Sequence, residues 1–174
     1  MKKLLAIICI CALTLTITAC EQSINEVPEK APSLEVSLLS QSVQAIQLST
    51  SWNGNISSYN SDSPHPLQLS PAEFDRATLS LDNGNGEIEL QFSDDYPPQE
   101  ISAVRWLAEY ATGNQDIEDV FNKSEPVAIS GNIISIVNDE NDYIYEVYAR
   151  WADGLEPGKP GSGSSRYTFR TVCN

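Results

Sequence analysis

The feature that most constrains this fold is a recurring alternation of apolar and polar residues over short stretches. Every second side chain is apolar in residues 143–151, 87–92 and 46–52, and the closing stretch 166–173 repeats the pattern. Side chains of a β-strand point to opposite faces in turn, so a period of two indicates strands with one buried face. The chain is therefore expected to be built from strands rather than helices.

About eight such segments follow one another, joined by stretches rich in glycine, proline, asparagine and aspartate. They cover residues 34–52 with a break near 40–41, then 78–81, 87–92, 101–110, 127–130, 133–137, 143–151 and 166–173. A proline and a glutamate after Ser70, and apolar residues in 117–121, allow short helical turns at two places. The sequence predicts an all-β, antiparallel sandwich of seven to nine strands with one or two helical turns at most.

The N-terminus has the composition of a secretory leader. Lys2 and Lys3 precede an uncharged apolar run over residues 4–17. This run is shorter than the ~20 residues that a membrane-spanning helix needs, which favours a signal peptide.

The leader ends in Leu-Thr-Ile-Thr-Ala-Cys at Cys20, which resembles the lipobox of bacterial lipoproteins. The resemblance implies cleavage after Ala19 and a diacylglycerol on the Cys20 thiol, so that the protein is held to the outer face of a bacterial membrane by lipid. An uncleaved anchor and a plain secreted protein are the alternatives. The expected organisation is a signal peptide over 1–19, a lipidated polar tether over 20–33 and one sandwich domain over 34–174.

The charge balance limits the partners. Asp and Glu total 24 against 10 Lys and Arg, a net charge of −14. Binding to nucleic acid or to anionic headgroups needs basic patches, so neither is expected.

The four cysteines do not form a disulfide framework. Cys9 and Cys11 lie in the leader and Cys20 is the acylation site, which leaves Cys173 without an intramolecular partner. Cys173 continues the last strand pattern and is predicted to be a small buried hydrophobe. A reactive thiol or an intermolecular bridge is the alternative.

Several stretches of the body resemble a known extracellular domain. They are 61–67 (Ser-Asp-Ser-Pro-His-Pro-Leu), 86–92, Val104-Arg105-Trp106, 143–151 and 167–170. The domain is similar to one in small Gram-positive surface lipoproteins and at the extracellular C-terminal end of some β-lactam-sensor-type membrane metallopeptidases. The resemblance implies an immunoglobulin-like sandwich and transfers no catalytic residue, because the His-Glu-x-x-His zinc motif is absent from this sequence.

The sequence offers few candidate ligand groups, and each has a plainer explanation. The single histidine, His65, stands between two prolines and is predicted to be a turn residue. The acidic turns 82–87 and 138–142 offer oxygens suited to calcium but lack the spacing of a calcium loop, which favours ordinary hairpin turns. The adjacent carboxylates of 94–95 and 118–119 are expected to be solvated.

Trp52, Trp106 and Trp151 each lie on the apolar face of a predicted strand. Core packing is therefore favoured over a sugar-binding platform. No catalytic, cofactor or metal residue is predicted, and no enzymatic activity is expected.

The function expected from these features is that of a membrane-anchored binding or interaction module with an unidentified ligand. Loops 53–66 and 154–165 are the candidate surface, because binding loops sit on rigid β scaffolds. The alternative is an accessory or structural component of an envelope sensor or stress system that contacts an envelope protein. A surface hydrolase is the weaker alternative.

Overall fold

A computed structural model describes residues 28–52, 55–57, 63–82, 84–93, 96–111, 117–137, 139–151 and 161–174. The leader, Ala19, Cys20 and the first part of the expected tether lie outside the described residues. In the described part, no helix is long and apolar enough to cross a membrane.

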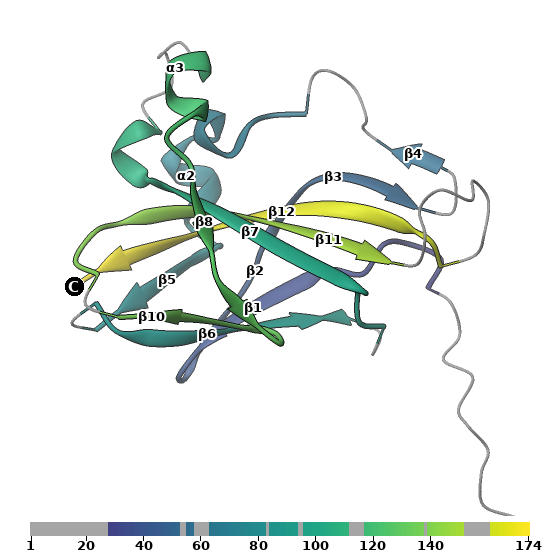
Figure 1. Ribbon diagram of the computed structural model, residues 1–174, viewed down its shortest axis with the longest axis horizontal. Helices are drawn as coiled ribbons and strands as arrows, with labels where there is room; N and C mark the ends of the chain where they lie inside the picture. The colour runs from purple at the N-terminus through teal and green to yellow at the C-terminus, as the bar shows by residue number, and fades with distance from the viewer. Residues whose placement is uncertain are drawn as a thin grey trace, which may run out of the picture.

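Two β-sheets pack face to face (Figure 1). The first sheet has the order β2 (Gln41–Gln44), β1 (Leu34–Leu38), β6 (Gly86–Phe92), β10 (Ile133–Ile136), β9 (Ile129–Ser130). The second has the order β4 (Asn55–Ser57), β3 (Ile46–Trp52), β12 (Gly163–Cys173), β11 (Tyr143–Trp151), β7 (Glu100–Leu107), β8 (Glu125–Val127). These neighbours are antiparallel, while β5 (Thr78–Leu81) runs parallel to the C-terminal part of β12.

The predicted antiparallel sandwich is confirmed, and its strand order is immunoglobulin-like. The run β1–β6–β10–β9 corresponds to the ABED sheet of that fold and β12–β11–β7 to its GFC sheet. The described residues form more strands than the seven to nine expected, because short segments such as β4, β8 and β9 extend the sheet edges.

The core between the sheets follows the predicted alternation. In β11, Tyr143, Tyr145, Val147, Ala149 and Trp151 are all buried. The other buried residues of this core are Leu34, Val36, Leu38, Ala45, Trp52, Ala77, Leu79, Leu81, Ile88, Leu90, Ala103, Ile134, Ile136, Tyr167 and Phe169. Burial of these apolar side chains is the main stabilising contribution, at about 25 cal/mol per Å².

Strand β3 departs from the expectation that residues 46–52 share one buried face. Ser49 is opposite Arg166 and Gln47 is opposite Tyr167, so Leu48 is an extra residue in the ladder. Such a bulge changes the face on which the following residues lie. Leu48 consequently packs on the outer face of the second sheet, whereas Trp52 packs between the sheets.

Short helical turns cover part of the outer face of the second sheet. They are η1 (Pro66–Gln68), α2 (Pro71–Phe74), η3 (Ala108–Tyr110) and α3 (Ile117–Phe121). Beneath them lies a second apolar cluster of Leu48, Leu67, Leu69, Phe74, Trp106, Val120 and Ile144. The start of α2 is as predicted, since Glu73 accepts a hydrogen bond from the Ser70 amide at 2.7 Å.

Two predicted strands are wrong in extent. The segment expected over 101–110 ends at Leu107, because residues 108–110 turn into η3. The segment expected over 127–130 is divided at Ala128, with β8 in the second sheet and β9 in the first. The chain crosses between the sheets at this residue.

Candidate functional site

Several strand ends lie at one end of the sandwich. They are the last residues of β6 and β11, the first residues of β7 and β12, and the β9–β10 turn. The register shows this, since Ile133 is opposite Glu89, Arg150 is opposite Glu100 and Trp151 is opposite Gly163. In immunoglobulin-type domains the loops at an end of the sandwich are where ligands bind. We call this the loop end.

Most of the predicted loop surface lies outside the described residues, namely 53–54, 58–62 and 154–160. Its described parts are not free loops. Ser63 donates a hydrogen bond to the Leu48 carbonyl at 2.9 Å, and residues 163–165 already belong to β12. The site that the structure does describe at this end is a groove.

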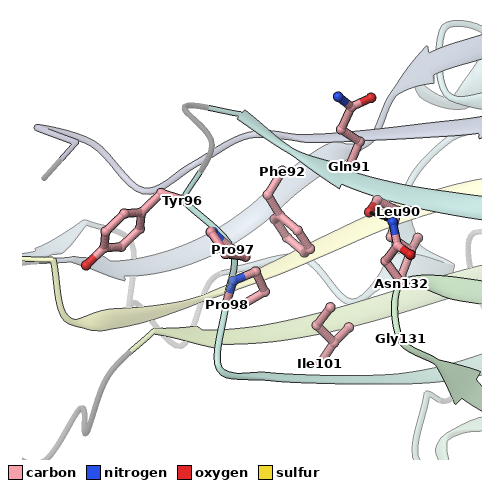
Figure 2. A pocket seen from close by; sticks show the side chains of 9 residues that line it. All are labelled: Leu90, Gln91, Phe92, Tyr96, Pro97, Pro98, Ile101, Gly131 and Asn132. Carbon is pink, nitrogen blue, oxygen red and sulfur yellow. Dashed lines mark hydrogen bonds between the residues drawn. The ribbon is translucent and has the colours of Figure 1, made fainter. Parts of the chain in front are cut away.

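The groove lies between the end of β6 and the start of β7 and has a volume of about 560 Å³ (Figure 2). It is lined by Leu90, Gln91, Phe92, Tyr96, Pro97, Pro98, Ile101, Gly131 and Asn132. Figure 2 shows Phe92 and Ile101 pointing toward one another from the two sheets, with Pro98 beside them. The Gln91 side chain points away. The groove is thus an apolar opening between the two sheets.

The wall of the groove is held in place by hydrogen bonds. The indole nitrogen of Trp151 donates to the Tyr96 carbonyl at 2.9 Å, and the Tyr96 hydroxyl donates to the Gly161 carbonyl at 3.2 Å. The Gln99 amide donates to the Arg150 carbonyl at 2.8 Å. A wall fixed in this way needs little ordering when a ligand binds, which lowers the entropic cost of binding.

Aromatic rings support the groove from behind. Trp151 packs edge-on against Phe92, with ring centroids 5.5 Å apart, and against Trp52 at 5.4 Å. Trp52 in turn packs edge-on against Tyr96 at 6.1 Å. Edge-to-face pairs of this kind add about 0.5–1.5 kcal/mol each beyond area burial.

The prediction that the three tryptophans pack in the core is confirmed, with one difference in place. Trp52 and Trp151 are buried between the sheets. Trp106 is equally buried but lies under the helical turns on the outer face of the second sheet.

The backbone of β6 has an edge that extends past β10. Pairing with β10 ends at Glu89, and the Leu90 amide donates to the Asn132 carbonyl at 2.8 Å. Alternate residues of an antiparallel strand direct their N–H and C=O groups to the same neighbour. Phe92 therefore directs its N–H to the side of β10, beyond the last residue of β6 that pairs with β10.

The polypeptide enters the domain at the same end. Pro28 accepts a hydrogen bond from the Trp52 indole nitrogen at 2.9 Å, and Pro32 accepts one from the Tyr167 hydroxyl. The Ser93 amide donates to the Ser33 carbonyl at 2.9 Å. The last six residues of the expected tether, 28–33, thus contact the body beside the groove.

His65 acts as a turn residue, as predicted. It is the N-cap of η1, where its Nδ1 accepts a hydrogen bond from the Leu67 amide at 3.2 Å. Its ring packs against Trp106 with centroids 4.9 Å apart. Burial lowers the pKa of His65, and the nearby Glu146 carboxylate partly opposes this shift.

The two acidic turns lie against each other, and ion pairs engage two of their carboxylates. The Asp139 amide donates to the Gly84 carbonyl at 3.0 Å. Asp139 pairs with Arg105 at 2.6 Å and Asp142 pairs with Arg170 at 2.8 Å. Among the described residues, no three His, Cys, Asp or Glu side chains are placed to hold a metal ion.

The remaining predicted positions are placed as follows. Residues 94–95 lie outside the described part, and Asp119 is exposed. Cys173 is partly buried, packs against the core, and its thiol donates to the Asp139 carbonyl at 3.1 Å.

Sequence reasoning missed the groove. The Tyr-Pro-Pro run at 96–98 follows the predicted strand 87–92 and carries neither a strand nor a helix pattern. A pair of prolines beside an aromatic residue between two strands is nevertheless a usable signal of an apolar wall without backbone donors.

Comparisons with protein-family models, curated proteins and solved structures find no match for this chain.

Proposed function

We propose that this chain is an extracytoplasmic, lipid-anchored binding module, and that the groove at the loop end is its ligand site. The observation that carries the proposal is an apolar opening whose wall is already fixed by Trp151, Tyr96 and Gln99. Ligand sites are typically preformed concave surfaces of 300–1,000 Å³ with apolar walls and few polar groups.

The lipid anchor is supported by the sequence pattern that ends at Cys20. Two acyl chains together hold a protein stably on a membrane, whereas one holds it only marginally. Metabolic labelling with a fatty-acid analogue should mark the protein, and Cys20→Ser should abolish the label. A Cys20→Ser protein that still takes up the label would refute the anchor.

The binding function is tested by blocking the groove. Ile101→Asp places a charge between Phe92 and Pro98 and should remove capture of a partner by crosslinking in intact cells. Ser102→Asp is the matched control, because Ser102 is the exposed neighbour of Ile101 on β7 and does not line the groove. Equal capture by both variants, with both folded by circular dichroism, would refute the groove as the site.

A second function is favoured by the place where the chain enters. Because residues 28–33 lie beside the groove, a lipid on Cys20 would keep the groove near the membrane, where an envelope sensor or stress protein could reach it. Repeated recovery of one membrane protein in the crosslinking experiment would favour this accessory role. Recovery of a secreted or wall-linked partner would favour the general binding module.

A further inference from the structure

We infer that the groove holds part of an acyl chain of the protein's own lipid on Cys20 when that lipid is out of the bilayer. This inference rests on the proposed lipid anchor and names the chemistry that the groove takes. Three features of the molecule point to this occupant: the apolar lining, the place where the entering polypeptide is fastened, and the short stretch of chain between that place and Cys20.

The lining of the groove suits a hydrocarbon. Phe92 and Ile101 point toward one another from the two sheets, with Pro98 beside them (Figure 2). Proline has no N–H, so Pro97 and Pro98 bring no backbone donor to this wall. An acyl chain in contact with these side chains would leave water, and each CH₂ group buried in this way favours the bound state about fourfold.

Polar groups in the wall are already engaged by the domain itself. The Tyr96 hydroxyl donates to the Gly161 carbonyl at 3.2 Å, and the Tyr96 carbonyl accepts from the Trp151 indole nitrogen at 2.9 Å. The Asn132 carbonyl accepts from the Leu90 amide at 2.8 Å. Covering groups that already have partners costs no hydrogen bond, so these groups do not oppose a hydrocarbon occupant.

The entering polypeptide is fastened to the wall of the groove. The Trp52 indole nitrogen donates to the Pro28 carbonyl at 2.9 Å, and the Trp52 ring packs edge-on against Tyr96 with centroids 6.1 Å apart. Tyr96 is one of the lining residues, so a single indole ring separates Pro28 from the groove wall. The Ser93 amide makes a second attachment, donating to the Ser33 carbonyl at 2.9 Å directly after β6.

The connection from this attachment to Cys20 is short. Cys20 precedes Pro28 by eight residues, which reach roughly 28 Å at full extension. A lipid on Cys20 can therefore meet the groove of its own chain. Binding within one molecule by a short connection takes place at an effective concentration of the order of millimolar, an advantage that a free fatty acid lacks.

The bilayer competes with the groove for the lipid. Its interior is as apolar as a leucine side chain, so the groove gains the acyl chain only once the lipid has left the bilayer. By covering part of that chain, the groove would lower the cost of leaving. The groove would thus favour passage of the protein from one membrane surface to another.

The test is photocrosslinking of the full mature protein with its lipid. Cells are grown with a fatty-acid analogue that carries a photoreactive diazirine, and the purified protein is diluted below the critical micelle concentration of its detergent before irradiation. Mass spectrometry should place the crosslinks within residues 90–101. A mixture of ¹⁵N-labelled and unlabelled protein should show that each crosslink joins a lipid to its own chain.

Two variants identify the groove as the site, with both checked for folding by circular dichroism. Ile101→Asp places a charge among the apolar side chains and should lower the crosslink yield about tenfold or more. Ser102→Asp is the matched control and should leave the yield unchanged, because Ser102 is exposed and does not line the groove.

Crosslinks outside residues 90–101, crosslinks between two chains, or equal yields for the two variants would overturn the inference. So would equal labelling of the groove in Cys20→Ser by the free photoreactive fatty acid at the same concentration, because attachment would then bring no advantage. If Cys20 took up no label, the proposed anchor would fail together with the inference. Label on Cys20 without crosslinks in the groove would remove the inference alone and leave the anchor standing.

Discussion

The side chain of Gln41 pairs with the backbone of Ser80 as another strand would. Its Nε2 donates to the Ser80 carbonyl at 2.8 Å and its Oε1 accepts from the Ser80 amide at 2.8 Å. Gln41 belongs to β2 at the edge of the first sheet, and Ser80 belongs to β5 in the second. One side chain thus closes the sandwich along this side.

Replacing Gln41 with alanine should therefore destabilise the fold. The change leaves a partly buried donor and acceptor of Ser80 without these partners, at a cost of about 1–3 kcal/mol. Gln41→Glu should not restore the bridge, since a carboxylate oxygen would then face the Ser80 carbonyl oxygen to which the Gln41 Nε2 donates. Urea unfolding measures the difference, with exposed Ser42→Ala on the same strand as control. Equal midpoints for Gln41→Ala and Ser42→Ala would show that the bridge contributes nothing.

Gly84 and Gly131 together allow a test of how the two acidic turns pack. Gly84 lies in one of these turns, and Gly131 is the comparison position outside them. Both have a positive φ, +64° and +65°. A Cβ at Gly84 would lie 2.2 Å from the Asp139 carbonyl oxygen, whereas one at Gly131 would meet nothing within 4 Å. Gly131→Ala should lower the free energy of unfolding by about 1–2 kcal/mol, which is the cost of placing alanine in a left-handed backbone conformation. Gly84→Ala should lower it clearly more, because its Cβ would also collide with the Asp139 carbonyl. Thermal unfolding that ranks them in the opposite order would contradict the packing of the two turns.

His65 should make stability depend on mildly acidic pH. Burial lowers the pKa of its imidazole, with Glu146 opposing this shift and Arg166 adding to it. The unfolded chain then binds a proton below about pH 6.5 before the folded chain does, so stability is fully present above that pH and falls as the pH drops. His65→Asn keeps an acceptor for the Leu67 amide but does not titrate. Between pH 7.5 and pH 5.5, the free energy of unfolding measured with denaturant should fall more for the wild type than for His65→Asn. An equal fall in both proteins would exclude His65 as a source of the pH dependence.

The Tyr167 hydroxyl should hold residues 28–33 against the sandwich domain. Burial raises the pKa of Tyr167 to about 12, so the hydroxyl that donates to Pro32 stays protonated at neutral pH. Tyr167→Phe removes this hydrogen bond and should cost about 1 kcal/mol. It should also speed proteolytic cleavage within residues 28–33, measured by mass spectrometry. Tyr148→Phe, on the opposite face of the second sheet, should leave the cleavage rate unchanged.

The sequence predicted those parts of the fold that depend on local pattern. The bounds of β11 and β5, the start of α2 and the burial of the three tryptophans follow from alternation, capping and apolarity. These signals lie within a few neighbouring residues, so one stretch of sequence is enough to read them.

The parts that were missed depend on residues far apart in the chain. The bulge at Leu48 arises from its register with β12, about 118 residues later. The Gln41–Ser80 bridge joins two sheets, and the groove exists because β10 ends before β6 does. Nothing in the local sequence of any one of these segments specifies where its partner strand stops.

The attachment of residues 28–33 beside the groove has a consequence for orientation. About eight residues separate Cys20 from Pro28, a reach of roughly 28 Å at full extension. If Cys20 carries lipid as proposed, this short connection keeps the loop end facing the bilayer. Asn174, held at the far end by its bond to the Leu81 carbonyl, then points outward. A fluorescent or affinity tag joined there would project from the cell and leave the groove uncovered.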